Sequence, residues 1–108
     1  MITYSVTITI QTSIECEWLD WMTKVHVPDV LRTGCFSDCR IHKLLSPDDD
    51  GPTYVLQYQC QSLEEYHRYR DNFAPALQKD HSDRFAGRFR GSRQVLEELV
   101  RLESPSGL

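Results

Sequence analysis

The sequence predicts a single α+β domain of the ferredoxin-like type, with the element order βαββαβ. Three observations support this prediction: two segments alternate apolar and polar residues as strands do, two others repeat apolar residues at helical spacing, and their order leaves a place for a final strand. The chain has 108 residues, of which 40% are hydrophobic, and this suits one modest core. We expect the domain to span residues 1–102, with a flexible tail at 103–108.

The N-terminal half is predicted to form a strand, an interrupted helix and a second strand. Residues 2–11 alternate cleanly between apolar and polar types, which is typical of a half-buried strand. Thr12 and Glu15 fit a capping box at the start of a helix. The apolar residues that share one face of this helix are Ile14, Trp18, Trp21, Met22 and Val25. Pro28 is expected to break the helix and can begin a short second turn that stops at Gly34. Residues 36–45 follow as the second strand.

The C-terminal half repeats this pattern after a turn at residues 46–52. Residues 53–61 are predicted to form a strand, and Ser62 begins a helix with a second capping box. The helix carries an apolar stripe of Tyr66, Tyr69, Phe73 and Leu77, and Pro75 interrupts it. We expect a last strand over residues 88–98, although residues 95–102 also contain good helix formers at helical spacing. The expected sheet is antiparallel and four-stranded, with both helices on one face.

The other face of the predicted sheet is polar but carries no charge. Its residues are Thr3, Ser5, Thr7, Thr9, Gln57, Gln59 and Gln61. A sheet face that is open to water usually carries lysine and glutamate instead. A neutral polar face suits packing against a second copy of itself, so we expect a homodimer.

The composition excludes several classes of function. A formal charge of −4 argues against binding to nucleic acid or to an anionic membrane, and no apolar run is long enough to span a bilayer. The four cysteines form no CxxC motif, so we expect reduced thiols in a cytoplasmic protein. The histidines lack metal-site spacing, and nucleotide-binding motifs are missing. We therefore expect neither a metal nor a cofactor.

Three stretches resemble a bacterial protein family that is known only as a domain of unknown function. They are WLDWMTKVHVPDVLRTGCF, YVLQYQ and YRDNFAPALQKDHSDRF, and the resemblance extends from residue 2 to about residue 97. That family looks like a member of the dimeric α+β barrel superfamily. Relatives there include cofactor-free quinone-forming monooxygenases and muconolactone isomerase-like enzymes. The resemblance implies the fold more firmly than any reaction.

His26 is the first candidate for a functional residue. It lies one helical turn after Met22, at the flank of the predicted apolar face and just before Pro28. Related barrels often place a helix histidine in the cleft between helices and sheet, where it can act as an acid or base. The alternative is that His26 binds a carbonyl left without a donor by Pro28.

The remaining candidates would bind a ligand rather than react with it. His81 and Arg84 lie three residues apart, so they would share a helix face and could bind a carboxylate or enolate oxygen; alternatively they are dipole-stabilising residues at a helix end. An aromatic pocket, or part of the core, could be formed by Trp18, Trp21, Tyr54, Tyr58, Tyr66 and Tyr69. Four arginines could bind an anionic ligand, or protect an edge strand by their charge: Arg84, Arg88, Arg90 and Arg93. The leading hypothesis is a small-molecule-binding protein, with cofactor-free enzymology on an aromatic or enolisable substrate. The rival is a non-catalytic dimerisation or interaction module.

Overall fold

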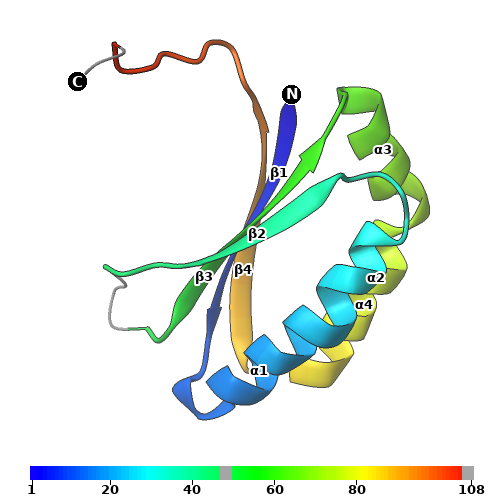
Figure 1. Cartoon of the computed structure of the whole chain (residues 1–108). Helices are drawn as coiled ribbons and strands as arrows, with labels where there is room; N and C mark the ends of the chain where they lie inside the picture. Colours follow the sequence, from blue (N-terminus) through cyan, green and yellow to red (C-terminus); the bar gives the residue numbers. More distant parts are fainter. Residues whose placement is uncertain (47–49, 106–108) are drawn as a thin grey trace.

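A four-stranded antiparallel sheet forms one layer of the molecule, and helices cover one of its faces (Figure 1). The computed structural model describes residues 1–46 and 50–105. The strands are β1 (Ile2–Ile10), β2 (Asp38–Lys43), β3 (Thr53–Cys60) and β4 (Phe89–Glu97), in the order β2-β3-β1-β4. The predicted ferredoxin-like fold is confirmed.

The core lies between the helices and the inner face of the sheet, where the alternation of residues had placed it. Tyr4 of β1 pairs with Tyr58 of β3, and both side chains are buried. The other buried residues of these two strands on the same face are Ile2, Ile8, Ile10, Tyr54, Leu56 and Cys60. Because side chains alternate across a strand, the neutral Thr and Gln residues lie on the opposite face, away from the helices.

The first helical segment continues through Pro28, where a break was predicted. It consists of η1 (Thr12–Ile14), α1 (Glu15–Trp21), the π-helical turn η2 (Met22–His26) and α2 (Val27–Leu31). The capping box at Thr12 is wrong: no side chain caps this end, and the Glu15 carboxylate instead accepts hydrogen bonds from Tyr54 and Lys43. Pro28 does not break the segment, because it lies in the first turn of α2, where an N–H is dispensable.

The π-helical turn also changes which residues face the core. A π turn bonds residue i to i+5 and so holds one residue more than an α turn. Within this turn Val25 is directed outward and is 41% exposed, whereas Val27 and Val30 beyond it are buried. The prediction that Val25 belongs to the apolar face is therefore wrong, and His26 is brought to the flank of the core.

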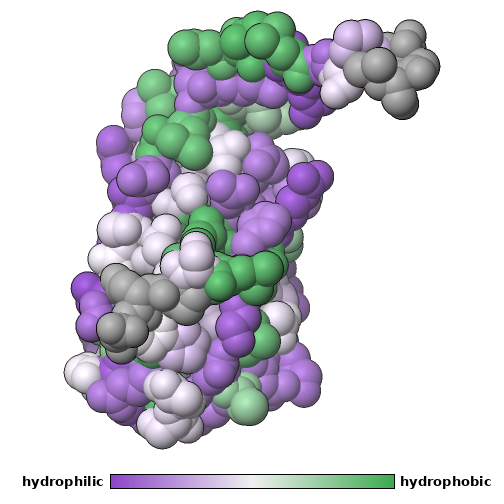
Figure 2. All heavy atoms as spheres, turned by 90° about the vertical axis from the view of Figure 1, so that its left-hand side faces the viewer, coloured by the Kyte–Doolittle hydropathy of each residue, from purple (hydrophilic) through white to green (hydrophobic). Residues whose placement is uncertain are grey.

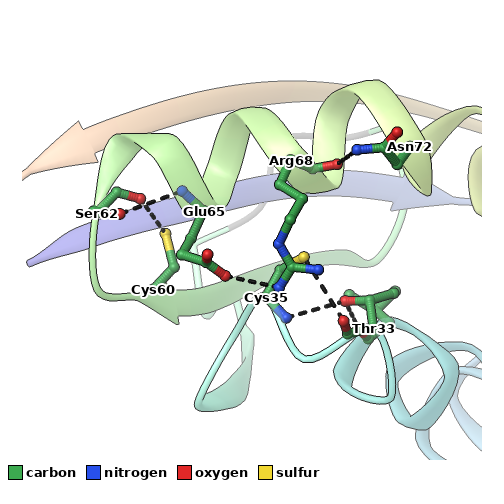
Figure 3. A network of polar contacts seen from close by, with 8 residues as sticks. Thr33, Cys35, Cys60, Ser62, Glu65, Arg68 and Asn72 are labelled. Carbon is green, nitrogen blue, oxygen red and sulfur yellow. Dashed lines mark hydrogen bonds and ion pairs between the residues drawn. The ribbon is translucent and has the colours of Figure 1, made fainter.

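The second helical segment is divided at Pro75, as predicted, into α3 (Leu63–Asn72) and α4 (Ala74–Phe85). The Ser62 side chain caps α3 by accepting a hydrogen bond from the Glu65 backbone N–H. Figure 3 shows that Arg68 extends from α3 toward the loop that follows α2. Its guanidinium binds the carboxylate of Glu65, one turn earlier on the same helix.

The chain beyond β4 leaves the body of the molecule. The strand ends at Glu97, which confirms the strand prediction, and residues 98–105 form neither strand nor helix. We call residues 98–105 the C-terminal arm; it stands clear of the domain and gathers apolar side chains (Figure 2). The predicted tail at 103–108 lies partly outside the described residues, as does the predicted turn at 46–52. Within the described parts of the chain, no helix is long and apolar enough to cross a membrane.

Candidate functional site

A cavity of about 260 Å³ lies between the helices and the inner face of the sheet. Its apolar wall is formed by residues that include Ile8, Met22, Leu56, Tyr58, Tyr69 and Phe89. Its polar wall includes Tyr4, His26, Gln78, His81, Ser82 and Arg93. A cavity that combines apolar side chains with convergent polar groups is one form that small-molecule sites take.

His81 is fixed in this wall by Trp18, a residue 63 positions away in the sequence. The fully buried Trp18 indole donates a hydrogen bond from Nε1 to His81 Nε2 at 2.9 Å. An indole nitrogen is only a donor, so His81 Nε2 must be an acceptor and the ring proton lies on Nδ1. Burial, with the nearby His26 and Arg93 adding to it, lowers the pKa of His81 to about 4. The ring is therefore neutral at physiological pH.

His26 lies beside His81, with 5.8 Å between the ring centroids, and stacks on Trp21 at 5.3 Å. Its ring nitrogens form no hydrogen bond within the described part of the chain. The alternative prediction, that His26 binds a backbone carbonyl left without a donor by Pro28, is therefore wrong. Burial lowers the pKa of His26, an effect that the carboxylates of Asp29 and Asp80 oppose. His26 thus offers a neutral imidazole to the cavity.

A second hollow opens on the surface at the other side of His26. It is lined by Trp21, Val25, His26, Asp29, Asp80, Asp83 and Arg84. The Arg84 guanidinium lies 5.4 Å from the centre of the Trp21 ring, within the range of a cation–π contact. Of the predicted ligand-binding residues, Trp21 and Arg84 therefore meet each other outside the cavity. His26 borders both hollows.

Tyr54 and Tyr58 were predicted together but have different surroundings. Tyr58 lies in the cavity wall. Tyr54 packs against Trp18, and its hydroxyl donates to Glu15 Oε2 at 2.6 Å. Tyr54 lies apart from the residues that line the cavity, because its side chain extends toward the start of α1, where Lys43 also binds Glu15.

Tyr4 and Gln78 are polar wall residues that the sequence analysis did not select, and Arg93 was considered there only as one of four arginines. Arg93 lies on β4 opposite Val6 of β1, so its side chain shares the inner face with Tyr4. Burial raises the pKa of Tyr4, an effect that the charge of Arg93 opposes. Strand alternation places Arg93 on the inner face of the sheet, at its exposed edge, and Arg90 on the outer face. That alternation was the available signal, but the arginines had been treated as one group.

No group of three or more histidine, cysteine or acidic side chains is placed to hold a metal ion among residues 1–46 and 50–105. The cavity offers hydrogen-bonding groups, one cation and aromatic side chains.

The family model described as a domain of unknown function, DUF4286, matches residues 1–99. The chain belongs to the DUF4286 family. This confirms the resemblance seen in the sequence. No curated protein sequence matches this DUF4286 protein significantly.

Solved structures of similar fold are distant in sequence. SnoaB, a cofactor-independent oxygenase of Streptomyces nogalater, is 14% identical with a TM-score of 0.69, covering 95% of this chain and 97% of its own. A dimeric ferredoxin-like protein from an uncultured marine organism is 14% identical with a TM-score of 0.68, covering 96% and 100%. A Streptomyces coelicolor monooxygenase solved with nanaomycin D is 12% identical with a TM-score of 0.59, covering 94% and 92%. At these identities the likeness shows that the DUF4286 protein has the fold of dimeric α+β barrel proteins.

Proposed function

We propose that this protein binds a small aromatic or enolisable molecule in its cavity and transforms it without a cofactor, in the cytoplasm. The observation that carries the proposal is a neutral imidazole, that of His26, at the wall of the cavity and without a hydrogen-bond partner among the described residues. No buried side-chain nitrogen or oxygen of the described residues lacks a partner, so the ring nitrogens of His26 are accessible. A ligand in the cavity can therefore form a hydrogen bond with this ring or exchange a proton with it. Cofactor-independent oxygenases among the proteins of similar fold support the same reading.

The proposed chemistry begins with proton transfer to His26. The ligand's acidic C–H bond breaks, its electron pair stays on the ligand as an enolate, and the proton forms a new N–H bond on the imidazole. Return of the proton at another carbon would give an isomerase. If molecular oxygen reacts with the enolate, a CH₂ group plus O₂ becomes a carbonyl plus water, which is the monooxygenase outcome. Both reactions require the same neutral base.

Replacing His26 with glutamine is expected to abolish this proton transfer without unfolding the protein. A positioned general base contributes about 10²–10⁴-fold to a rate, whereas the ring forms no hydrogen bond to the other residues that the structure describes. The probe is 2-tetralone in D₂O, whose exchange of the acidic C–H protons is followed by NMR. Exchange should fall by at least 10²-fold in His26→Gln, while the free energy of unfolding changes by less than about 1 kcal/mol.

The matched control for that experiment is His67→Gln, on the helix α3 and outside the cavity wall. It should leave both exchange and stability unchanged. Equal exchange by wild type and His26→Gln would contradict the proposal, as would a wild-type protein that leaves 2-tetralone unchanged and neither binds nor oxidises related quinols.

We also propose that the protein is a homodimer, which would remain true if the rival, non-catalytic function were correct. The helices cover only one face of the sheet (Figure 1). On β1 and β3 the other face carries neutral residues, with Thr3 Oγ1 bonded to Gln59 Oε1, whereas the edge strands add Asp38, Arg40 and Arg90 to it. The C-terminal arm adds apolar side chains, with Leu99 84% and Leu102 87% exposed. Apolar groups gathered in this way favour a protein partner over water. The dimeric state given for a protein of similar fold agrees.

Removal of residues 99–108 is expected to weaken the dimer at least tenfold, because it removes the exposed leucines of the arm. Sedimentation equilibrium on the full-length and shortened chains measures the dissociation constant directly. A chain ending at Glu103 retains those leucines and is the control. A full-length protein that is monomeric at micromolar concentration would contradict the proposed dimer.

A further inference from the structure

The cavity wall carries one formal charge, and that charge is positive. Among the described residues that line it, Arg93 is the only one with a permanent charge, and none is an aspartate or glutamate. Arg93 forms no ion pair with a carboxylate of the described chain. The surface hollow on the far side of His26 differs, since it contains Asp29, Asp80 and Asp83. The negative charges thus lie outside the cavity. The guanidinium on its wall has no carboxylate partner among the described residues.

The neutral polar groups of the wall can supply hydrogen-bond donors. His81 is 6% exposed; its Nε2 is taken by Trp18, so its Nδ1–H is left for the cavity. The Tyr4 hydroxyl stays protonated because burial raises its pKa, and Gln78 can present its amide N–H₂. Together with the fork of N–H groups on Arg93, these donors match the oxygen atoms of an anion.

The size of the cavity limits the remainder of the ligand. At about 260 Å³ it falls just below the range of about 300–1,000 Å³ that is typical for drug-sized ligands. Gly91 contributes no side chain to the wall: a Cβ there would lie 3.2 Å from Thr7 O and 3.5 Å from Ile8 Cγ1. The rest of the wall is largely aromatic and aliphatic, so one or two rings can fill the space that the anion leaves.

We propose that the cavity selects an aromatic anion of one or two rings, a carboxylate or an enolate, whose oxygen atoms are bound by Arg93. This inference rests on the proposed function and specifies its ligand class. The ring system lies against Tyr58, Tyr69 and Phe89, and its charged end faces Arg93 with His81 Nδ1–H as a second donor. An enolate formed by loss of a proton to His26 would be stabilised by the same guanidinium.

The test compares 2-naphthoate with 2-naphthamide, which has nearly the same shape and no charge. Isothermal titration calorimetry is expected to show that wild type binds the naphthoate at least tenfold more tightly. In Arg93→Gln, naphthoate binding should weaken at least tenfold while naphthamide binding changes less than twofold. Arg93→Lys, which keeps the charge, should recover part of the loss. Anthracene-2-carboxylate, with three rings, should bind wild type at least tenfold more weakly than naphthoate.

The control variant is Arg90→Gln, on the same strand but on the opposite face of the sheet, which should bind both probes as wild type does. The NMR signals of the His26 and His81 rings show whether a probe occupies the cavity. Equal binding of the two probes within the cavity, unchanged in Arg93→Gln, would overturn the anion inference and leave the proposed function standing. If neither naphthoate nor 2-tetralone shifts those signals, the cavity is not a ligand site and both proposals are wrong.

Discussion

Trp18→Ala is expected to lower the free energy of unfolding by about 3–5 kcal/mol, the usual cost of deleting a large buried aromatic side chain. The indole is 0% exposed, lies against the Tyr54 ring at 5.1 Å, and donates its only hydrogen bond to His81. Total stabilities of small domains are about 5–15 kcal/mol, so this one change removes a large share. Urea denaturation monitored by circular dichroism measures the loss.

Two comparisons test the cause of that loss. Trp21→Ala should cost clearly less, because Trp21 is only partly buried and borders the surface hollow. Trp18→Phe keeps most of the apolar volume but leaves His81 Nε2 without its donor, so it should cost about 1–3 kcal/mol. A Trp18→Ala loss below about 1 kcal/mol, or one equal to that of Trp21→Ala, would mean that this part of the core is wrongly described.

The second large effect is a loss of stability in mild acid caused by His81. In the unfolded chain a histidine has a pKa of about 6.5, whereas in the folded protein burial lowers the pKa of His81 to about 4. The unfolded state therefore takes up the proton first, so stability is full above pH 6.5 and falls as the pH drops toward 4. The loss should be roughly 2 kcal/mol between pH 7 and pH 5, before most carboxylates titrate. His26, whose pKa is also lowered, changes stability in the same direction.

Urea denaturation at a series of pH values measures this dependence. His81→Gln keeps an acceptor for Trp18. In this variant the free energy of unfolding should change less between pH 7 and pH 5, and the change that remains should come from His26. His42→Gln, which alters an exposed histidine on β2, should retain the wild-type slope. An unchanged slope in His81→Gln would show that His81 is not the buried neutral group.

The strands and the interrupted second helix could be predicted from the sequence because their determinants are local. The alternation of apolar and polar residues predicted β1 and β3, and Ser62 indicated the start of α3. The last strand, β4, was predicted because the order of the other elements left a place for it. The first helix was only half predictable. A single π-helical turn shifts every later residue around the axis, and no local pattern in residues 22–26 announces it. The error at Val25 and the inward position of His26 have this one cause.

The site was less predictable than the fold because it depends on contacts between distant parts of the chain. His26, Tyr58 and His81, which were predicted as site residues, line one cavity, and their roles in binding stay predictions. The Trp18 donor that sets the His81 tautomer lies on a different helix, and no spacing rule connects the two residues. Arg93 could have been separated from Arg90 by strand alternation, but its importance appears only with the cavity.

His26 lies between the cavity and the surface hollow, so the ligand and a released proton can use different sides of the imidazole. A ligand in the cavity reaches one side of the imidazole, and the other side borders the surface hollow with its three aspartates. In the proposed reaction, a proton accepted from the ligand can therefore pass to solvent through the hollow while the ligand stays in the cavity. The base would be reset for the next turnover without the cavity having to empty first.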